Sequence, residues 1–264
     1  MRGFVVPSFA VVLTAVALLA GGGLSPQAAQ SATGTIKGHV KLSGKLPGNT
    51  VIRMGKDPKC SEANKGKQVV QETVKATIDG SLANVFVRLD GTFPSTPVPK
   101  TAVTVDQHNC LYSPRVVGIR VGQVLEIRNS DNLLHNVHSV TNRDNQFNFG
   151  QARAGVVDTF KMKNEEIMVR LGCDVHSWMV AYIGVVTNPY FAVSDATGSF
   201  QINGVPPGTY TINAWQERYG PLKQTVKVTA GGTATVDFTY TGNEAKPAAK
   251  NIEDSAVRLS PGSI

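Results

Sequence analysis

The chain has 264 residues, of which 41% are hydrophobic and 17% are charged. This composition is typical of a globular protein, and the length is sufficient for one or two packed cores. The 26 lysine and arginine residues and the 19 acidic residues give a net charge of +7. The basic residues are spread along the chain, without a dense cluster or interleaved aromatic residues, which argues against nucleic-acid binding.

The first 31 residues have the pattern of a secretory signal peptide. Arg2 precedes an apolar run from Phe4 to Ala20, and a stretch of small residues follows. We expect cleavage near Ala29 to Ala32 and export to the periplasm or the extracellular space. An uncleaved anchor is the alternative, but Pro7 interrupts the run, which is shorter than the ~20 residues of a membrane span. No later segment is apolar enough to cross a membrane, so we expect no transmembrane span in the mature chain.

Beyond residue 34, apolar and polar residues alternate with a period of two, and no segment shows sustained helical periodicity. Turn sequences rich in glycine, proline and aspartate separate the alternating segments. The pattern therefore predicts an all-β fold of the sandwich type. The predicted strands lie within residues 36–42, 85–89, 117–121, 125–128, 167–171 and, further along, 200–240.

Three stretches depart from this alternation. Residues 55–68 are polar and rich in lysine, and we expect them to form a long loop held in place by Cys60. Residues 91–101 have the proline-rich and threonine-rich composition of a linker. Residues 242–264 contain few large apolar side chains, and we expect them to form a disordered tail.

The chain contains three cysteines, an odd number that leaves one thiol unpaired if the other two form a disulfide. Cys60 and Cys110 lie in loop-like surroundings, whereas Cys173 follows a predicted strand. We therefore predict a Cys60–Cys110 disulfide and a free Cys173. A closed loop of about 50 residues would stabilise the fold by roughly 4 kcal/mol.

The segment from Leu171 to Met179 carries the strongest chemical signal. Cys173, His176 and Met179 place a thiol, an imidazole and a thioether within seven residues, directly after a predicted strand. Cys173 has the same parity as Leu171, so its side chain should point toward the core. A buried thiolate needs a cation, and copper is the first-row metal whose protein sites combine two imidazoles, one thiolate and a weak thioether.

A second imidazole must come from elsewhere, and the sequence His-Asn-Val-His at residues 135–138 supplies it. His135 and His138 are an odd number of residues apart, so in a strand they face opposite sides and only one can enter the site. His135 lies where a loop meets a strand, and from there a ligand can reach the end of a sandwich. We therefore expect His135, rather than His138, to be the ligand.

The pattern Cys-x2-His-x2-Met, combined with the upstream His-Asn-Val-His, resembles the ligand set of the cupredoxins, above all their plastocyanin and amicyanin branch. The resemblance covers residues 101–186 and implies a Greek-key β-sandwich with one type 1 (blue) copper ion. It implies that His135 and His176 bind through ring nitrogens. It also implies that Cys173 is the strong equatorial ligand and Met179 the long axial one.

The same resemblance has implications for two positions next to the ligands. Asn136 would hydrogen-bond around the ligand loop and help to fix the thiolate of Cys173. Ser177 departs from the pattern, because many relatives have proline there. The departure removes no ligand, but it would loosen the ligand loop.

The segments on either side of the cupredoxin-like region resemble a second family. Residues 34–44 and 191–212 are similar to the carboxypeptidase regulatory-like (transthyretin-like) β-sandwich. We therefore expect residues 34–100 and 187–241 to form one small β-sandwich, with the cupredoxin of residues 101–186 inserted between them. Two consecutive units are the alternative.

The cupredoxin resemblance implies an electron carrier and no enzyme activity. The implied partner is an exported redox protein, such as a cytochrome c or a membrane-bound oxidase. His176 is the expected exposed edge of the site. Leu133 and Leu134 are expected to form an apolar docking patch. Trp178 either belongs to that patch or packs against the neighbouring domain.

Other functions would use the same residues or part of them. A copper storage or delivery protein would use the same ligands, and so would a surface interaction module in which copper is structural. A cysteine nucleophile with a histidine base would leave Met179 and His135 unexplained. Structural zinc would require four firm ligands, and methionine is a poor one.

Overall fold

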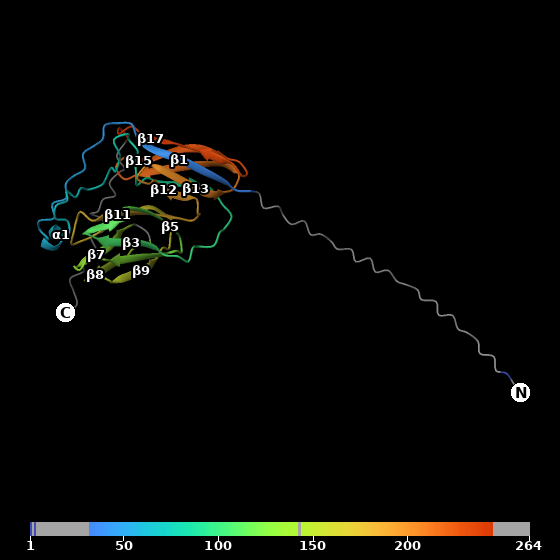
Figure 1. Cartoon of the computed structure of the whole chain (residues 1–264), viewed down its shortest axis with the longest axis horizontal. Helices are drawn as coiled ribbons and strands as arrows, with labels where there is room; N and C mark the ends of the chain where they lie inside the picture. The colour runs from blue at the N-terminus through green and yellow to red at the C-terminus, as the bar shows by residue number, and fades with distance from the viewer. Residues whose placement is uncertain (2, 4–31, 142–143, 245–264) are drawn as a thin grey trace. The chain divides into compact units, whose positions relative to one another are not determined.

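The structure is a computed structural model that describes residues 1, 3, 32–141 and 144–244 (Figure 1). Nearly all of the predicted signal peptide and most of the predicted tail lie outside the described residues. Within the described part of the chain, no helix is long and apolar enough to cross a membrane. The regular structure in that part consists of strands and one short helix, so the all-β prediction is confirmed.

Strands from residues 34–90 and 191–240 form a first β-sandwich, whose two sheets enclose one hydrophobic core. The first sheet has the order β13-β1-β16, and β17 also pairs with β1. Its strands are β1 (Gly34–Leu42), β13 (Ser199–Val205), β16 (Thr233–Thr235) and β17 (Phe238–Tyr240). The second sheet has the order β12-β2-β14-β15. Its strands are β2 (Phe86–Asp90), β12 (Phe191–Val193), β14 (Gly208–Gln216) and β15 (Gly220–Val228).

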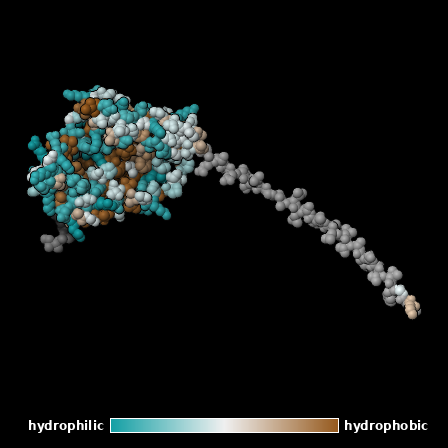
Figure 2. Space-filling model, viewed as in Figure 1, coloured by the Kyte–Doolittle hydropathy of each residue, from teal (hydrophilic) through white to brown (hydrophobic). Residues whose placement is uncertain are grey.

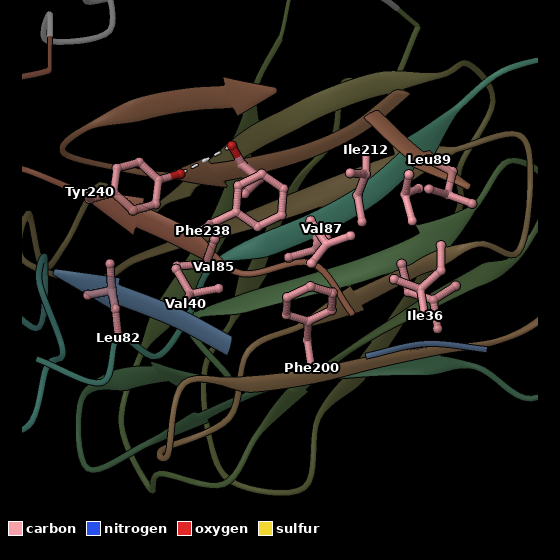
Figure 3. Close-up of a cluster of buried hydrophobic side chains, with 14 of the residues drawn as sticks. Ile36, Val40, Leu82, Val85, Val87, Leu89, Phe200, Ile212, Phe238 and Tyr240 are labelled. Atoms are coloured by element: carbon pink, nitrogen blue, oxygen red, sulfur yellow. Dashed lines mark hydrogen bonds between the residues drawn. The ribbon is translucent and has the colours of Figure 1, made fainter. Parts of the chain in front are cut away.

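Both sheets of the first sandwich contribute inward-facing side chains to its core (Figure 3). Ile36 of β1 and Leu89 of β2 are fully buried, and Phe200 and Phe238 pack with their ring centroids 6.3 Å apart. In β13 the buried Phe200 and Ile202 alternate with exposed neighbours, as the sequence period of two requires. Full burial of one such side chain contributes roughly 1.5–3 kcal/mol to the free energy of folding.

The strands between residues 103 and 186 form a second β-sandwich around a second core. One sheet has the order β5-β11-β10-β7-β8. Its strands are β5 (Val116–Arg120), β7 (His135–Val140), β8 (Asn148–Gln151), β10 (Glu166–Gly172) and β11 (Val180–Val186). The other sheet has the order β4-β3-β6-β9. Its strands are β3 (Val103–His108), β4 (Leu111–Ser113), β6 (Val124–Asn129) and β9 (Val157–Lys161).

Residues 51–71, hereafter the cap segment, do not join the first sandwich, although we expected residues 34–100 to belong to it. Met54 and Cys60 are buried in the core of the second sandwich instead. Cys60 forms the predicted disulfide with Cys110, which is thereby confirmed. Both of its cysteines lie in that core, so the bridge fastens the cap segment to the second sandwich and does not tie the two sandwiches together.

Within the cap segment, residues that we expected to form a plain loop contain the helix α1 (Pro58–Ala63). Its N-cap is Asp57, whose side chain accepts hydrogen bonds from the backbone N–H groups of Lys59 (2.9 Å) and Cys60 (3.1 Å). Aspartate at the N-cap followed by proline at the first helical position is a strong helix-start signal. The helix is only six residues long, too short to produce a helical period in the sequence.

The outer faces of two sheets meet where the sandwiches contact each other. Phe86, Val116, Met168 and Val186 form a separate buried cluster there. Figure 2 shows a largely hydrophilic surface on the face in view, with apolar groups near the position of β11 and β12 in Figure 1.

An ion pair between the sandwiches and two glycines that make room for aromatic rings support this contact. The guanidinium of Arg115 donates to both carboxylate oxygens of Glu217, at 2.7 and 2.8 Å. Both side chains are largely buried, and such two-point pairs are among the stronger charged contacts. Gly118 of β5 and Gly184 of β11 leave the room that the rings of Phe86 and Phe191 fill.

Substituting Gly184 by alanine should loosen this contact. The added methyl group would overlap the ring of Phe86, which is buried and cannot swing away. We expect the free energy of unfolding to fall by about 1–3 kcal/mol, the usual cost of overpacking. The measurement is urea unfolding of both proteins. Gly150→Ala in β8 is the control, because its methyl group would meet no atom within 4 Å. Equal effects of the two substitutions would contradict the proposed packing.

Candidate metal centre

Two adjacent strands and the loop after one of them bring the predicted ligands to one end of the second sandwich. β7 begins at His135 and pairs antiparallel with β10. Cys173 follows β10 directly, and residues 173–179 form the connection to β11, which pairs with β10 on its other side. Val169, Leu171 and Cys173 are all buried, as the parity of the strand predicts.

The ligand atoms of His135, Cys173 and His176 all lie within 4.8 Å of one another. Nδ1 of His135 lies 3.0 Å from Nδ1 of His176, and Sγ of Cys173 lies 3.8 Å from the same His176 atom. The exposed fractions of the three residues are 0%, 5% and 1%. The structure thus brings one thiol and two imidazoles together in the buried end of the second sandwich.

Met179 and His138, the other candidates, have different surroundings. Met179 is fully buried in the same core cluster as Cys173, and its backbone N–H donates to the carbonyl of His176 at 2.9 Å. His138 is not part of the group. It faces the other side of β7, and its Nδ1 lies 2.9 Å from a carboxylate oxygen of Asp174.

Each histidine of the group is held from behind by a carboxylate. Nε2 of His135 lies 2.9 Å from Asp131, and Nε2 of His176 lies 3.0 Å from Asp57. An Nε2–H that donates to a carboxylate leaves Nδ1 with its lone pair free for a metal. Two such lone pairs facing each other at 3.0 Å repel each other unless a metal ion or a proton lies between them.

The donor set fits copper. Two imidazole nitrogens and a thiolate, with the thioether of Met179 in the same core, are the ligands that type 1 copper sites combine. Burial raises the pKa of the Cys173 thiol, but hydrogen bonds from His135, from the backbone of Asn136 and from His176 outweigh it and bring the pKa to about 7. The thiolate that a metal needs is therefore accessible near neutral pH.

Asn136 fixes the start of the ligand loop. Its side-chain oxygen accepts a hydrogen bond from the backbone N–H of Asp174 at 2.7 Å, one residue beyond Cys173. Its side-chain amide donates to the carboxylate of Asp174 at 2.7 Å and to Asn148 at 3.0 Å. These bonds join β7 to the loop at the two positions adjacent to ligands.

Tyr112 and Asp131 are functional candidates that the sequence analysis missed. The hydroxyl of Tyr112 lies 2.7 Å from the carbonyl oxygen of Asn136 and 2.9 Å from that of Gly172, each next to a ligand. Asp131 accepts hydrogen bonds from the backbone N–H groups of Asn109 (2.8 Å) and Cys110 (2.7 Å) as well as from His135. The place of Asp131 four residues before His135 was a signal that could have been used.

His176 is not the exposed edge of the site that we expected. Cys60 Sγ lies 3.5 Å from its Nε2, Asp57 accepts the ring N–H, and the ring of Trp178 packs with its centroid 5.0 Å away. These neighbours leave only 1% of His176 exposed. The cap segment supplies two of these three contacts, which is why the short-range sequence pattern did not reveal the burial.

The expected docking patch is also changed. Leu134 is exposed by 51%, but Leu133 and Trp178 are half-buried, and the indole N–H of Trp178 donates to the carbonyl of Cys110 at 2.9 Å. Val175, which directly precedes His176, is exposed by 50%. The exposed apolar side chains beside the ligands are therefore Leu134 and Val175.

Replacing Asp131 by alanine should destabilise even the metal-free protein. The buried backbone N–H of Cys110, the part-buried N–H of Asn109 and the imidazole N–H of His135 would lose their acceptor. We expect a loss of about 2–4 kcal/mol in the free energy of unfolding, measured by urea titration without metal. Asp106→Ala is the control, because in the described part of the chain the side chain of Asp106 accepts hydrogen bonds from the exposed hydroxyl of Ser130 alone, and its loss should cost at most ~0.5 kcal/mol. A mild effect at Asp131 would contradict its role in fixing the turn.

Comparison with known proteins gives one family and several structures. The model of the carboxypeptidase regulatory-like domain matches residues 181–241, which start in β11 and include β12 to β17. No curated protein matches. Among solved structures, the chain is similar to a copper-containing nitrite reductase from Thermus scotoductus SA-01, with 18% identity, a TM-score of 0.32, and 37% of this chain and 25% of that chain covered.

Two smaller structures are covered almost completely. A purple cupredoxin from Nitrosopumilus maritimus has 21% identity and a TM-score of 0.28, over 31% of this chain and 98% of its own. A methionine-to-alanine mutant of amicyanin in its Cu(I) form has 16% identity and a TM-score of 0.30, over 38% of this chain and 98% of its own. These similarities are distant, so the case for copper rests on the donor atoms of this chain.

Proposed function

We propose that this protein binds one copper ion in a type 1 site and carries single electrons. The observation that carries this proposal is the pair of imidazole Nδ1 atoms facing each other at 3.0 Å beside the thiol of Cys173. A copper ion bound there would supply reversible one-electron chemistry. His135, His176, Cys173 and Met179 would hold it.

The surroundings of the donors favour a site that changes little during electron transfer. Asp131 and Asp57 fix the rings of His135 and His176, and Asn136 anchors the backbone next to Cys173. Side chains fixed in this way keep their positions when the charge of the site changes. Burial excludes water from the thiolate and protects it from oxidation.

We propose that the protein acts as a carrier and not as an enzyme. Its other two cysteines form a disulfide, so in the described chain only Cys173 offers a thiolate. The proposed partner is an exported redox protein, such as a cytochrome c or a membrane-bound oxidase, in the periplasm or the extracellular space. Leu134 and Val175 are where such a partner would approach, because their exposed apolar side chains flank the two histidines.

We also propose a discontinuous domain organisation, with a cupredoxin of residues 101–186 inserted between residues 34–100 and 187–241. Strand pairing supports this division, since β1 pairs with β13, β16 and β17, and β2 pairs with β12 and β14. Residues 51–71 are the exception, because they pack on the inserted part.

Loading the protein with Cu(II) should produce an intense thiolate-to-copper absorption band in the visible spectrum. Cys173→Ser should abolish the band, and His135→Ala should abolish or strongly weaken it. His138→Ala is the matched control, because this histidine lies on the same strand outside the site, and the band should persist. A colourless protein that binds only zinc would contradict the proposal.

The copper should also resist removal. Because the three donors of the buried group are at most 5% exposed, a modest chelator should leave the metal in place through repeated reduction and reoxidation. The measurement is the absorption band after each cycle. Rapid loss of copper to the chelator would instead indicate storage or delivery. Metal-dependent thermal stability without a reversible redox response would indicate structural copper in an interaction module.

A further inference from the structure

The cap segment is fixed over the site at three places. The disulfide joins Cys60 to Cys110 in the turn between β3 and β4. The side-chain amide of Asn64 donates to the carbonyl of Asn109 in the same turn at 2.9 Å. At the end of the segment, the side-chain amide of Gln71 donates to the carbonyl of Trp178 in the ligand loop, also at 2.9 Å. The cap segment is therefore anchored to the second sandwich by the disulfide and by hydrogen bonds.

Asp57 uses its two carboxylate oxygens for different purposes. Oδ1 accepts the hydrogen bonds of Lys59 and Cys60 that begin helix α1. Oδ2 lies 3.0 Å from Nε2 of His176, a residue 119 positions further along the chain. Because the helix start fixes the plane of the carboxylate, the second oxygen is aimed at the imidazole.

Capping a helix does not require this second contact. One side-chain oxygen is enough, and serine or asparagine would supply it as well as aspartate does. His135 has the same arrangement, but its carboxylate, Asp131, comes from the second sandwich itself. Only for His176 does the acceptor come from the added cap segment.

We propose that Asp57 is a positioning residue of the metal centre. It holds His176 with Nε2 protonated and with Nδ1 directed at Cys173 and His135, and it closes the solvent edge of that ring. A negative charge at this distance from the site also favours the higher oxidation state of a bound metal. The inference rests on the proposed copper site for the redox effect, but the orientation of His176 is a property of the protein without metal.

Two substitutions separate this role from helix capping. Asp57→Asn removes the charge and keeps a capping oxygen. Asp57→Ser keeps a capping oxygen but is too short to reach His176. Glu62→Gln is the matched control, because it removes a charge from the same helix at an exposed residue that pairs with the exposed Lys65. Circular dichroism and thiol titration of the metal-free proteins would verify that the fold and the disulfide are intact in all variants.

The first readout uses the metal-free protein. In the wild type, NMR of the imidazole nitrogens should show His176 protonated at Nε2, with a downfield proton typical of a bond to a carboxylate. Both Asp57 variants should lose that signal, and Glu62→Gln should keep it. An unchanged signal in the Asp57 variants would overturn the proposal, whether or not copper binds.

The second readout uses the copper-loaded protein. Both Asp57 variants should shift the equilibrium between Cu(II) and Cu(I) about tenfold toward Cu(I) and should lose copper to a chelator about tenfold faster, since each effect corresponds to one charged hydrogen bond. Glu62→Gln should change either quantity less than about twofold, because exposed charges are screened. Variants of Asp57 that match the wild type would overturn the redox role. A wild type that forms no copper site refutes the proposed function, and the NMR readout then decides the role of Asp57 by itself.

Discussion

Two imidazole nitrogens that face each other across 3.0 Å are the constraint on which the rest of the site depends. Such an arrangement is stable only if each ring is prevented from turning away, and the protein does this with a carboxylate behind each ring. The carboxylates in turn need fixed positions. The tight turn at Asn109 and Cys110 holds Asp131, and the first turn of α1 holds Asp57. The turn, helix α1 and the disulfide that fastens this helix to the turn therefore all help to fix the two Nδ1 atoms.

Much of the site could be predicted from local sequence because strands have a strict period. Parity placed Cys173 in the core, and the odd spacing between His135 and His138 separated the histidine in the group from the one outside it. The disulfide followed from counting cysteines and comparing their surroundings. The all-β fold followed from the same alternation of apolar and polar residues.

The parts that could not be predicted depend on contacts between distant segments. The Asp-Pro sequence at residues 57–58 indicates a helix start, but no neighbouring residue indicates that the carboxylate of Asp57 will contact His176. For the same reason the ring of His176 was expected at the surface. Gly118 and Gly184 give another example, because a glycine in a strand does not indicate which aromatic ring will pack against it. Each answer requires knowing which sheet or segment covers the residue.

The cross-link between Cys60 and Cys110 has a consequence for the order in which the protein is assembled. While both thiols are reduced, the cap segment is tethered to the second sandwich by noncovalent contacts alone and can open at small cost. Once the bridge has formed, the covalently tied backbone opens more rarely, and a metal ion would reach the site more slowly. If copper binds as proposed, oxidation of these two thiols would therefore limit the time available for metal insertion, and the same bond would then slow the loss of the metal.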